Sequence, residues 1–504
     1  MDKGENATHD DCGEKNEKDT SVSTVVTVDI QQYDEEKELK ELRQLLFKID
    51  IRIVILFSLC YLVSFMDRAN IGNAKIAGLT EVTEITENGY NTGLSIFFAG
   101  YVIFELPSNM VLNKVGPRIW IAFIMIMCGG VLMAMAAVKN DAHLIATRFF
   151  LGVAEGGLFP GILVAVSVWY TKAQLTKRIT IIICQSTIAN AFGGLLGYGT
   201  MYNLEGAKGL HSWQWLFLIE GILTIAIGVA VFILLPSFPE KVLNERQLAL
   251  FIKQMSKSAA NHHIFEGDIE EKFSWKHLLL ALKNYRLYIF CLVNISTGSV
   301  FYCNGLFLPS IVRGFGYTAL NAQLMTIPPN AIASVFAIIV ATSADYTKDR
   351  GYHIISSLIL AILGFALLIG LKNHGSTALY VAMTLTVIGL QCSVSCCMSW
   401  YSCNFAGRIK RSISLALIVS CGNLGGVISG QMYRQSDAPQ YIHGHTAALA
   451  LTFCGTFLAS LMKFILQHEN TRRNKMSTED RHQILSKIDA NKLGDKHPDY
   501  RYLS

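Results

Sequence analysis

Two ionisable residues lie seven positions apart in a segment that is otherwise apolar. Arg148 and Glu155 belong to the stretch RFFLGVAEGGLFPG at residues 148–161. Seven residues are nearly two turns of an α-helix, so both side chains would share one helix face, about 10 Å apart along the axis. A guanidinium can hold a carboxylate through two parallel hydrogen bonds, and a carboxylate can take up and release a proton. The pair therefore has the chemistry to bind an anion and to exchange a proton.

The helices that carry such residues are predicted to cross a membrane. The chain has 504 residues, of which 51% are hydrophobic and only 16% are charged. Soluble domains carry about 25% charged residues, and the apolar runs of about 20 residues that recur here are long enough to span a bilayer. The formal net charge of +5 gives no indication of a nucleic-acid partner. Charged groups deep in such helices are costly unless they are paired or face water, so they mark candidate functional sites.

We predict twelve transmembrane helices in two groups of six. Their expected positions are 51–67, 93–112, 119–138, 143–170, 179–199, 214–235, 286–308, 320–344, 354–371, 378–401, 413–433 and 446–466. The chain then divides into an N-terminal tail at 1–50, a first bundle at 51–235, a polar central loop at 236–285, a second bundle at 286–466 and a C-terminal tail at 467–504.

Both tails are predicted to be cytosolic and solvated. Residues 1–32 lack the apolar core of a cleaved signal peptide, and 33–50 have the spacing of a surface helix. With an even number of spans both tails share one side. Basic residues gather in the turns on that side, as the positive-inside rule expects of the cytosol: Lys114, Arg118, Lys172, Lys177, Arg178, Lys348, Arg350, Lys410 and Arg411.

The chain contains an internal duplication. The segment WYTKAQLTKRITIIICQSTIANAFGG begins at Trp169, and the similar WYSCNFAGRIKRSISLALIVSCGNLGG begins at Trp400. The basic turns NKVGPR at Asn113 and DYTKDR at Asp345 are separated by nearly the same offset. Parallel repeats of six helices are the pattern of the major facilitator fold, so we predict an all-α membrane protein of that fold with two pseudo-symmetric bundles.

Several motifs resemble the fungal allantoate permease family, the anion:cation symporters of the major facilitator superfamily. The resemblance runs through nearly the whole chain and implies a carrier for a small organic anion such as allantoate, nicotinate, pantothenate, biotin or a sulfur compound, usually taken up with protons. Asn113 stands where the superfamily turn has an aspartate, whereas the second copy keeps Asp345 and Arg350. The motifs, besides residues 148–161, are SFMDRANIGNAKIAGL at 64–79, GYVIFELPSNMVLNKVGPRIW at 100–120, WQWLFLIEGI at 213–222 and GDKHPDYRY at 494–502.

Three residues are the main candidates for charge handling. We predict that Arg148 binds the substrate carboxylate and that Glu155 is the proton site; the vesicular organic-anion transporters resemble the chain in this spacing. The alternative is a structural role, with Arg148 paired to a carboxylate of another helix and Glu155 bonded to a neighbouring helix. Glu105, two residues before Pro107, is either a second proton site or the counter-charge of Arg148.

Further candidates come from the first helix and from the second bundle. Arg68 follows Asp67 at the predicted outer end of the first span, and its match to the family's DR motif implies a role in binding the substrate; an interfacial anchor is the alternative. Asp67 is interpreted as its structural partner, and Glu220 as a packing residue. The second bundle offers uncharged polar groups instead, among which we predict substrate contacts from Tyr302, Asn304 and Gln391.

The function that these predictions favour is proton-coupled import of a small organic anion by alternating access. The alternative is a nutrient sensor built on the same fold. An integral-membrane enzyme finds no support, because no nucleophile constellation or metal-ligand spacing is visible in the sequence. We expect no cofactor, no metal and no nucleic acid. The partners are the anion, protons and the lipid bilayer, and we expect a monomer in the plasma membrane, with a vacuolar or other internal membrane as the alternative.

Overall fold

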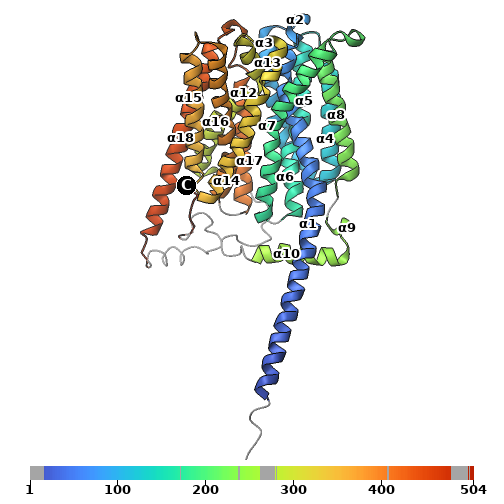
Figure 1. Cartoon of the computed structure of the whole chain (residues 1–504), viewed down its shortest axis with the longest axis vertical. Coiled ribbons are helices and arrows are strands. Elements are labelled where there is room, and N and C mark those ends of the chain that lie inside the picture. Colours follow the sequence, from blue (N-terminus) through green and yellow to red (C-terminus); the bar gives the residue numbers. More distant parts are fainter. Residues whose placement is uncertain are drawn as a thin grey trace, which may run out of the picture.

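The computed structural model is all helical in the part of the chain it describes. That part comprises residues 16–170, 172–236, 239–260, 279, 281–405, 408–477, 479, 498 and 500–503. Within it, twelve spans form two bundles of six side by side (Figure 1). The predicted major facilitator fold is confirmed.

The first bundle is built from three pairs of packed helices: α1 on α7, α3 on α5 and α4 on α8. Two short segments, α5 and α6, together make its fourth span. The bounds are α1 (Asn16–Ile76), α3 (Glu87–Val115), α4 (Pro117–Met135), α5 (Asp141–Glu155), α6 (Leu158–Trp169), α7 (Lys172–Asn203) and α8 (Ser212–Leu234).

The second bundle repeats this pairing with α12 on α17, α14 on α16 and α15 on α18. Each pair joins the helices that correspond to a pair of the first bundle, so the internal duplication seen in the sequence is also a duplication of packing. The bounds are α12 (Tyr285–Gly314), α13 (Ala319–Met325), α14 (Ile327–Thr347), α15 (Gly351–Gly370), α16 (Ser376–Cys403), α17 (Arg408–Ser429) and α18 (Ile442–Asn474).

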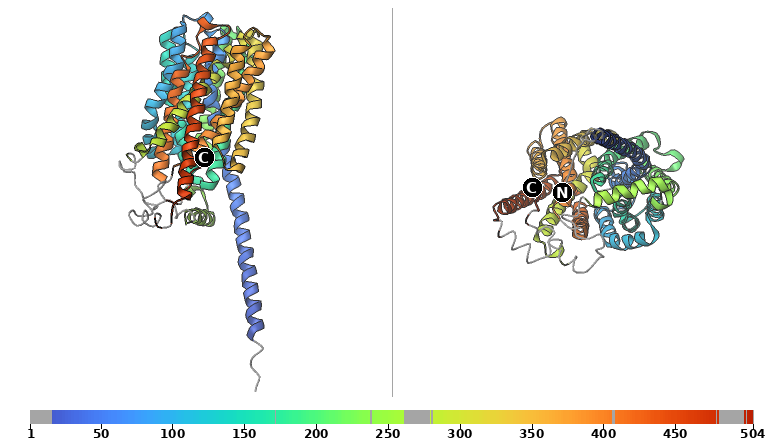
Figure 2. Two further views of the ribbon diagram at one scale, coloured as in Figure 1. Left: turned by 90° about the vertical axis from the view of Figure 1, so that its left-hand side faces the viewer. Right: turned by 90° about the horizontal axis from the view of Figure 1, so that it is seen from below.

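The two ends of the bundles differ in what they carry. α1 enters and α18 leaves at the same end (Figures 1 and 2), which we call the tail side. The described helices of the central loop lie there too: α9 (Pro239–Val242) precedes α10 (Glu245–Ala260). Ion pairs connect α10 to α1, from Arg246 to Glu41 at 2.9 Å and from Lys253 to Glu38 at 2.6 Å. The opposite end, the far side, holds α2 (Leu79–Val82), the turn Ala207–Gly209 and the turn Gln435–Asp437.

Ten of the twelve spans are long and apolar enough to cross a bilayer on composition alone. Their outward side chains suit lipid: Phe453, Phe457 and Phe464 of α18 are 64%, 61% and 67% exposed. Of the other two spans, α17 has an apolar part, Ile413–Ser429, that is shorter than those of the ten, and α3 contacts α17 across the two bundles. Glu105 of α3, for example, accepts a hydrogen bond from Ser420 of α17 at 2.9 Å.

Most helices extend beyond their predicted bounds, and two of the differences bear on the site. The first span was expected to end at residue 67, but α1 continues to Ile76, because its polar residues Asn70 and Asn73 are buried and hydrogen-bonded inside the bundle. Arg68 therefore lies within the helix rather than at its outer end. The fourth span breaks between Glu155 and Leu158, where Pro160 has no N–H to donate to the carbonyl four residues earlier.

The last residues of the chain dock onto the second bundle. Tyr502 is 4% exposed and its ring lies 4.1 Å from the guanidinium of Arg286. The backbone carbonyl of Leu503 accepts hydrogen bonds from Trp400 at 2.9 Å and Asn404 at 3.0 Å. This part of the C-terminal tail is thus packed, not solvated as predicted. Trp400 belongs to α16 and Asn404 directly follows it, while Arg286 belongs to α12, so the segment links two helices at the tail side of the second bundle.

Candidate functional site

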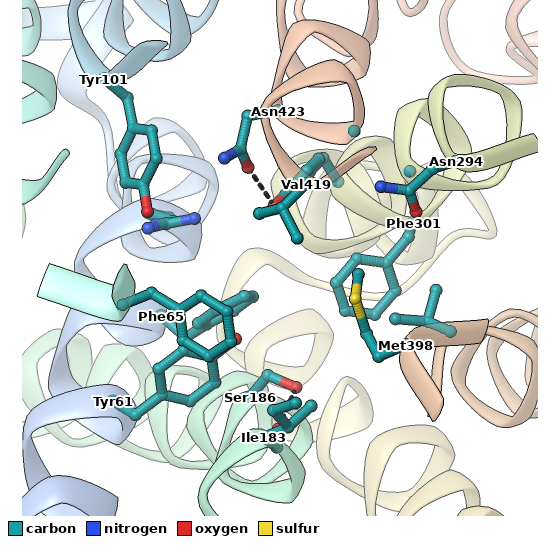
Figure 3. A pocket seen from close by; sticks show the side chains of 16 residues that line it. Tyr61, Phe65, Tyr101, Ile183, Ser186, Asn294, Phe301, Met398, Val419 and Asn423 are labelled. Atoms are coloured by element: carbon teal, nitrogen blue, oxygen red, sulfur yellow. Dashed lines mark hydrogen bonds between the residues drawn. The ribbon is translucent and has the colours of Figure 1, made fainter. Parts of the chain in front are cut away.

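A small cavity of about 70 Å³, partly open to solvent, lies between the two bundles. Its walls come from both halves of the chain. In Figure 3, Tyr61, Phe65 and Tyr101 of the first bundle face Asn294 and Phe301 of the second across the cavity. The remaining lining residues are Arg68, Phe159, Ile183, Ser186, Gly298, Tyr302, Val394, Met398, Val419, Gly422 and Asn423.

The far side of this cavity is closed by contacts between the bundles. Ser95 of α3 donates to the carbonyl of Val427 at 2.9 Å and accepts from Gln431 at 3.1 Å. Gln323 of α13 donates to the carbonyl of Asn73 at 3.1 Å. All these contacts join the halves at the far side, so we call them the far-side seal.

Arg68 is the cation that reaches the cavity. Its Nε and Nη2 both lie 2.8 Å from the same oxygen, Oε1 of Glu155, which also accepts a hydrogen bond from the Ser64 hydroxyl. Arg68 and Glu155 are 7% and 1% exposed. Charges buried this deeply need a partner of opposite charge. Arg68 and Glu155 form such a pair, and Arg68 also lines the cavity.

Three aromatic rings surround the Arg68 guanidinium. Its centre lies 4.9 Å from the rings of Phe65 and Tyr101 and 5.5 Å from that of Phe97. Cation–π contacts of this kind stabilise a partly desolvated guanidinium and restrict its orientation. Tyr61, Phe65 and Arg68 follow one another at helical spacing on α1, so this spacing was the sequence signal for the cavity face of that helix.

Arg148 is fully buried but is not among the residues that line the cavity. Its Nη1 donates to the backbone carbonyl of Asp67 at 3.3 Å, and its other guanidinium nitrogens have no hydrogen-bond partner within the described chain. The structure therefore joins Glu155 to Arg68, on another helix, rather than to Arg148 on its own helix. Substrate binding by Arg148 stays a prediction from sequence.

Glu105 is a link between the bundles. Its bond to Ser420 crosses from α3 to α17, whereas Arg148 bonds to α1. The structure therefore shows no contact between Glu105 and Arg148, and it does not support the interpretation of Glu105 as the counter-charge of Arg148. Its use as a second proton site stays a prediction.

The three polar residues predicted on the second bundle have different positions. Tyr302 lines the cavity, and its hydroxyl donates to Oδ1 of Asn423 at 2.8 Å. Asn304 and Gln391 do not appear in the cavity wall. Asn294 and Asn423 do, and sequence reasoning did not choose them because helix rotation cannot be read from isolated asparagines.

The fold and the site define a class of protein: a membrane carrier of two six-helix bundles, with a central cavity lined by an arginine that pairs with a buried glutamate. The chain belongs to the Major Facilitator Superfamily, whose family model matches residues 57–430.

Relatives and solved structures agree with this assignment. The chain is 32% identical over 434 residues to a transporter of Schizosaccharomyces pombe, covering 86% of this chain and 85% of the relative. It is 27% identical over 463 residues to a high-affinity nicotinic acid transporter of Saccharomyces cerevisiae, covering 92% and 85%. Among solved structures, a D-xylose–proton symporter has the same fold, with a TM-score of 0.64 at 16% identity over 82% of this chain and 97% of that one.

Proposed function

We propose that this transporter imports a small organic anion together with protons and that Arg68, not Arg148, holds the anion. The observation that carries the proposal is the buried ion pair beside the cavity, where Nε and Nη2 of Arg68, which lines the cavity, both meet Oε1 of Glu155. A substrate carboxylate that enters the cavity would compete with Glu155 for the same donors. Protonation of Glu155 removes its charge and frees Arg68 for the substrate.

This competition couples the two ligands. The anion binds well only when Glu155 carries a proton, and the proton stays only while the anion neutralises Arg68. The loaded site then has no net charge, which lowers the cost of enclosing it in a membrane protein. Tyr302 and Asn423 stand opposite as hydrogen-bonding groups for the rest of the substrate.

We place the tail side in the cytosol, since the basic turns lie there. The closed far-side seal then corresponds to an inward-facing state. The motifs shared with the allantoate permease family and the nicotinic acid transporter relative support a carboxylate vitamin, a ureide or a sulfur compound as substrate. The relatives' names favour transport over sensing. We propose a monomer in the plasma membrane, with an internal membrane as the alternative.

Uptake of radiolabelled carboxylates, ureides and sulfonates into cells that express the chain, with and without a protonophore, tests the proposal. Arg68→Gln should lower anion uptake at least about tenfold, because a hydrogen bond to a charged group contributes about 1.5–3 kcal/mol. Glu155→Gln should keep exchange of labelled for unlabelled anion but lose concentrative uptake.

Arg434→Gln and Glu84→Gln, which change exposed residues, are the matched controls and should transport normally. Normal anion affinity in Arg68→Gln would remove Arg68 from the binding site. Protonophore-sensitive accumulation in Glu155→Gln would remove Glu155 from coupling.

A further inference from the structure

A series of buried hydrogen bonds connects Glu220 to the far-side seal. Asn70 and Asn73 lie one turn apart on α1. The Asn70 side chain donates to Oε1 of Glu220 at 2.7 Å, and the Asn73 side chain donates to Oδ1 of Asn70 at 2.7 Å. The backbone carbonyl of Asn73 in turn accepts from Gln323, which belongs to the other bundle. The interior of the first bundle is therefore joined to a contact that closes the cavity.

Glu220 belongs to a buried cluster of charged groups that extends to Glu155 of the proposed binding site. It is fully buried, and its carboxyl lies within hydrogen-bonding reach of the Asp67 carboxyl on α1. Arg148 of α5 faces both acids, while Glu155 of α5 and the Cys128 thiol of α4 face Asp67. Two carboxyl groups share a hydrogen bond only when one of them carries a proton. A proton shared between the two acids would therefore remove their mutual repulsion.

At the other end of this series of hydrogen bonds, one side chain, Gln323, makes the contact of the far-side seal. Gln323 is fully buried, and it packs so closely on α7 that a Cβ at Gly197 would lie 2.8 Å from its side-chain amide. Its Oε1 has no hydrogen-bond partner among the described residues. Its shorter polar bond is the one to the Asn73 carbonyl at 3.1 Å, because its amide nitrogen meets Sδ of Met201 only at 4.0 Å. A small displacement of α1 at Asn73 is enough to weaken it.

We propose that Glu220 couples the proton held in this cluster to closure of the far-side seal, through Asn70, Asn73 and Gln323. While the proton is shared, Glu220 stays beside Asp67 and accepts the bond from Asn70. When the proton leaves, the two carboxylates repel each other. Asn70 then loses the acceptor of its hydrogen bond, and Gln323 loses its hydrogen bond to the Asn73 carbonyl. The seal closes on protonation and opens on deprotonation.

This order is the one that an importer needs, because a proton taken up on the far side would then close that side behind it. The direction of transport rests on the proposed function, but the coupling itself needs no substrate. It can therefore be measured on the purified chain alone.

Hydrogen–deuterium exchange of the purified full chain, corrected for intrinsic rates, tests the coupling at acidic and at alkaline pH. Peptides from 70–82 and 318–327 report on the seal, and peptides from 351–370 serve as an internal reference for folding. In the wild type, we expect the seal peptides to exchange at least about fivefold more slowly at acidic pH, the lower end of coupling between linked sites. The reference peptides should not respond.

Three variants separate the relay from general effects of mutation. Glu220→Gln cannot be deprotonated, so its seal should stay protected at both pH values. Asn70→Ala removes the connection but keeps both acids, so its seal should exchange faster and without pH response. Glu84→Gln, an exposed glutamate on the same side, should behave as the wild type.

A wild type without pH response at the seal would overturn the proposal. So would a full pH response in Glu220→Gln or in Asn70→Ala, provided the reference peptides exchange normally. A protein that shows the predicted exchange but transports no anion would instead contradict the proposed function alone, so the two failures are distinguishable.

Discussion

At the scale of single residues, the geometry of one guanidinium decides what the cavity can bind. Arg68 is held by an acid on one side and by aromatic rings on the other, so its planar fork has a defined orientation. A lysine at this position would keep the charge but lose the paired donors that match a carboxylate. Arg148 has no such environment, since it bonds to a backbone carbonyl inside the first bundle.

We expect Arg148→Gln to reduce stability rather than anion affinity. The change leaves the buried carboxyls of Asp67 and Glu220 without their cation, and removing one partner from a buried charge pair costs about 3–5 kcal/mol. A lower melting temperature of the purified protein, with an unchanged KM in the surviving fraction, would agree with this expectation. An unchanged melting temperature with a raised KM would instead support the carboxylate-binding role predicted from sequence. Arg434→Gln is the control.

At the scale of helices, glycines set how closely the two bundles approach. Gly197 of α7 accommodates Gln323, and Gly426 of α17 accommodates the ring of Phe98 from α3. Small residues of this kind allow close packing of membrane helices. Sequence analysis places them on the repeated spans, and the structure shows that they serve contacts between the bundles at the far side.

Gly426→Val should prevent the far side from closing. Its side chain would collide with the Phe98 ring, while the helices within each bundle keep their contacts. We expect transport to fall at least about tenfold, as for a loss of 1.4 kcal/mol or more from the closed state. A cysteine at position 95 should become reactive to an impermeant maleimide applied from the far side.

The matched control is Gly370→Val, because a Cβ at Gly370 meets open space. It should transport normally and leave the cysteine unreactive. Normal transport in Gly426→Val would show that closure of the far side does not need this contact.

At the scale of the whole molecule, the two bundles act as bodies that meet along the far side and enclose a cavity between them. Transport by this fold requires them to rock about the site. The contacts that must break are those of the far-side seal, which join α3 to α17 and the residues that follow it, and α1 to α13.

A covalent bond across the seal should therefore stop transport. The Gln431 side-chain nitrogen lies 3.1 Å from the Ser95 hydroxyl across the bundles, so the cysteines of Ser95→Cys with Gln431→Cys should be bridged by a short bifunctional methanethiosulfonate reagent, which should abolish uptake, with recovery on reduction. Ser343→Cys with His353→Cys, whose native side chains meet at 3.0 Å within the second bundle, should leave uptake intact under the same reagent. Continued uptake in the fully crosslinked first pair would contradict alternating access by rocking.

The sequence by itself determined the twelve spans, the duplication and the presence of buried charges, because apolar length and repeated motifs are local properties of the chain. It did not determine that α1 continues past Arg68, since Asn70 and Asn73 are compatible with a buried helix only when Glu220 lies beside them. Nor could spacing decide that Glu155 pairs with Arg68 of another helix instead of Arg148 of its own. That choice depends on how each helix is rotated about its axis, and the rotation is set by contacts between residues far apart in the sequence.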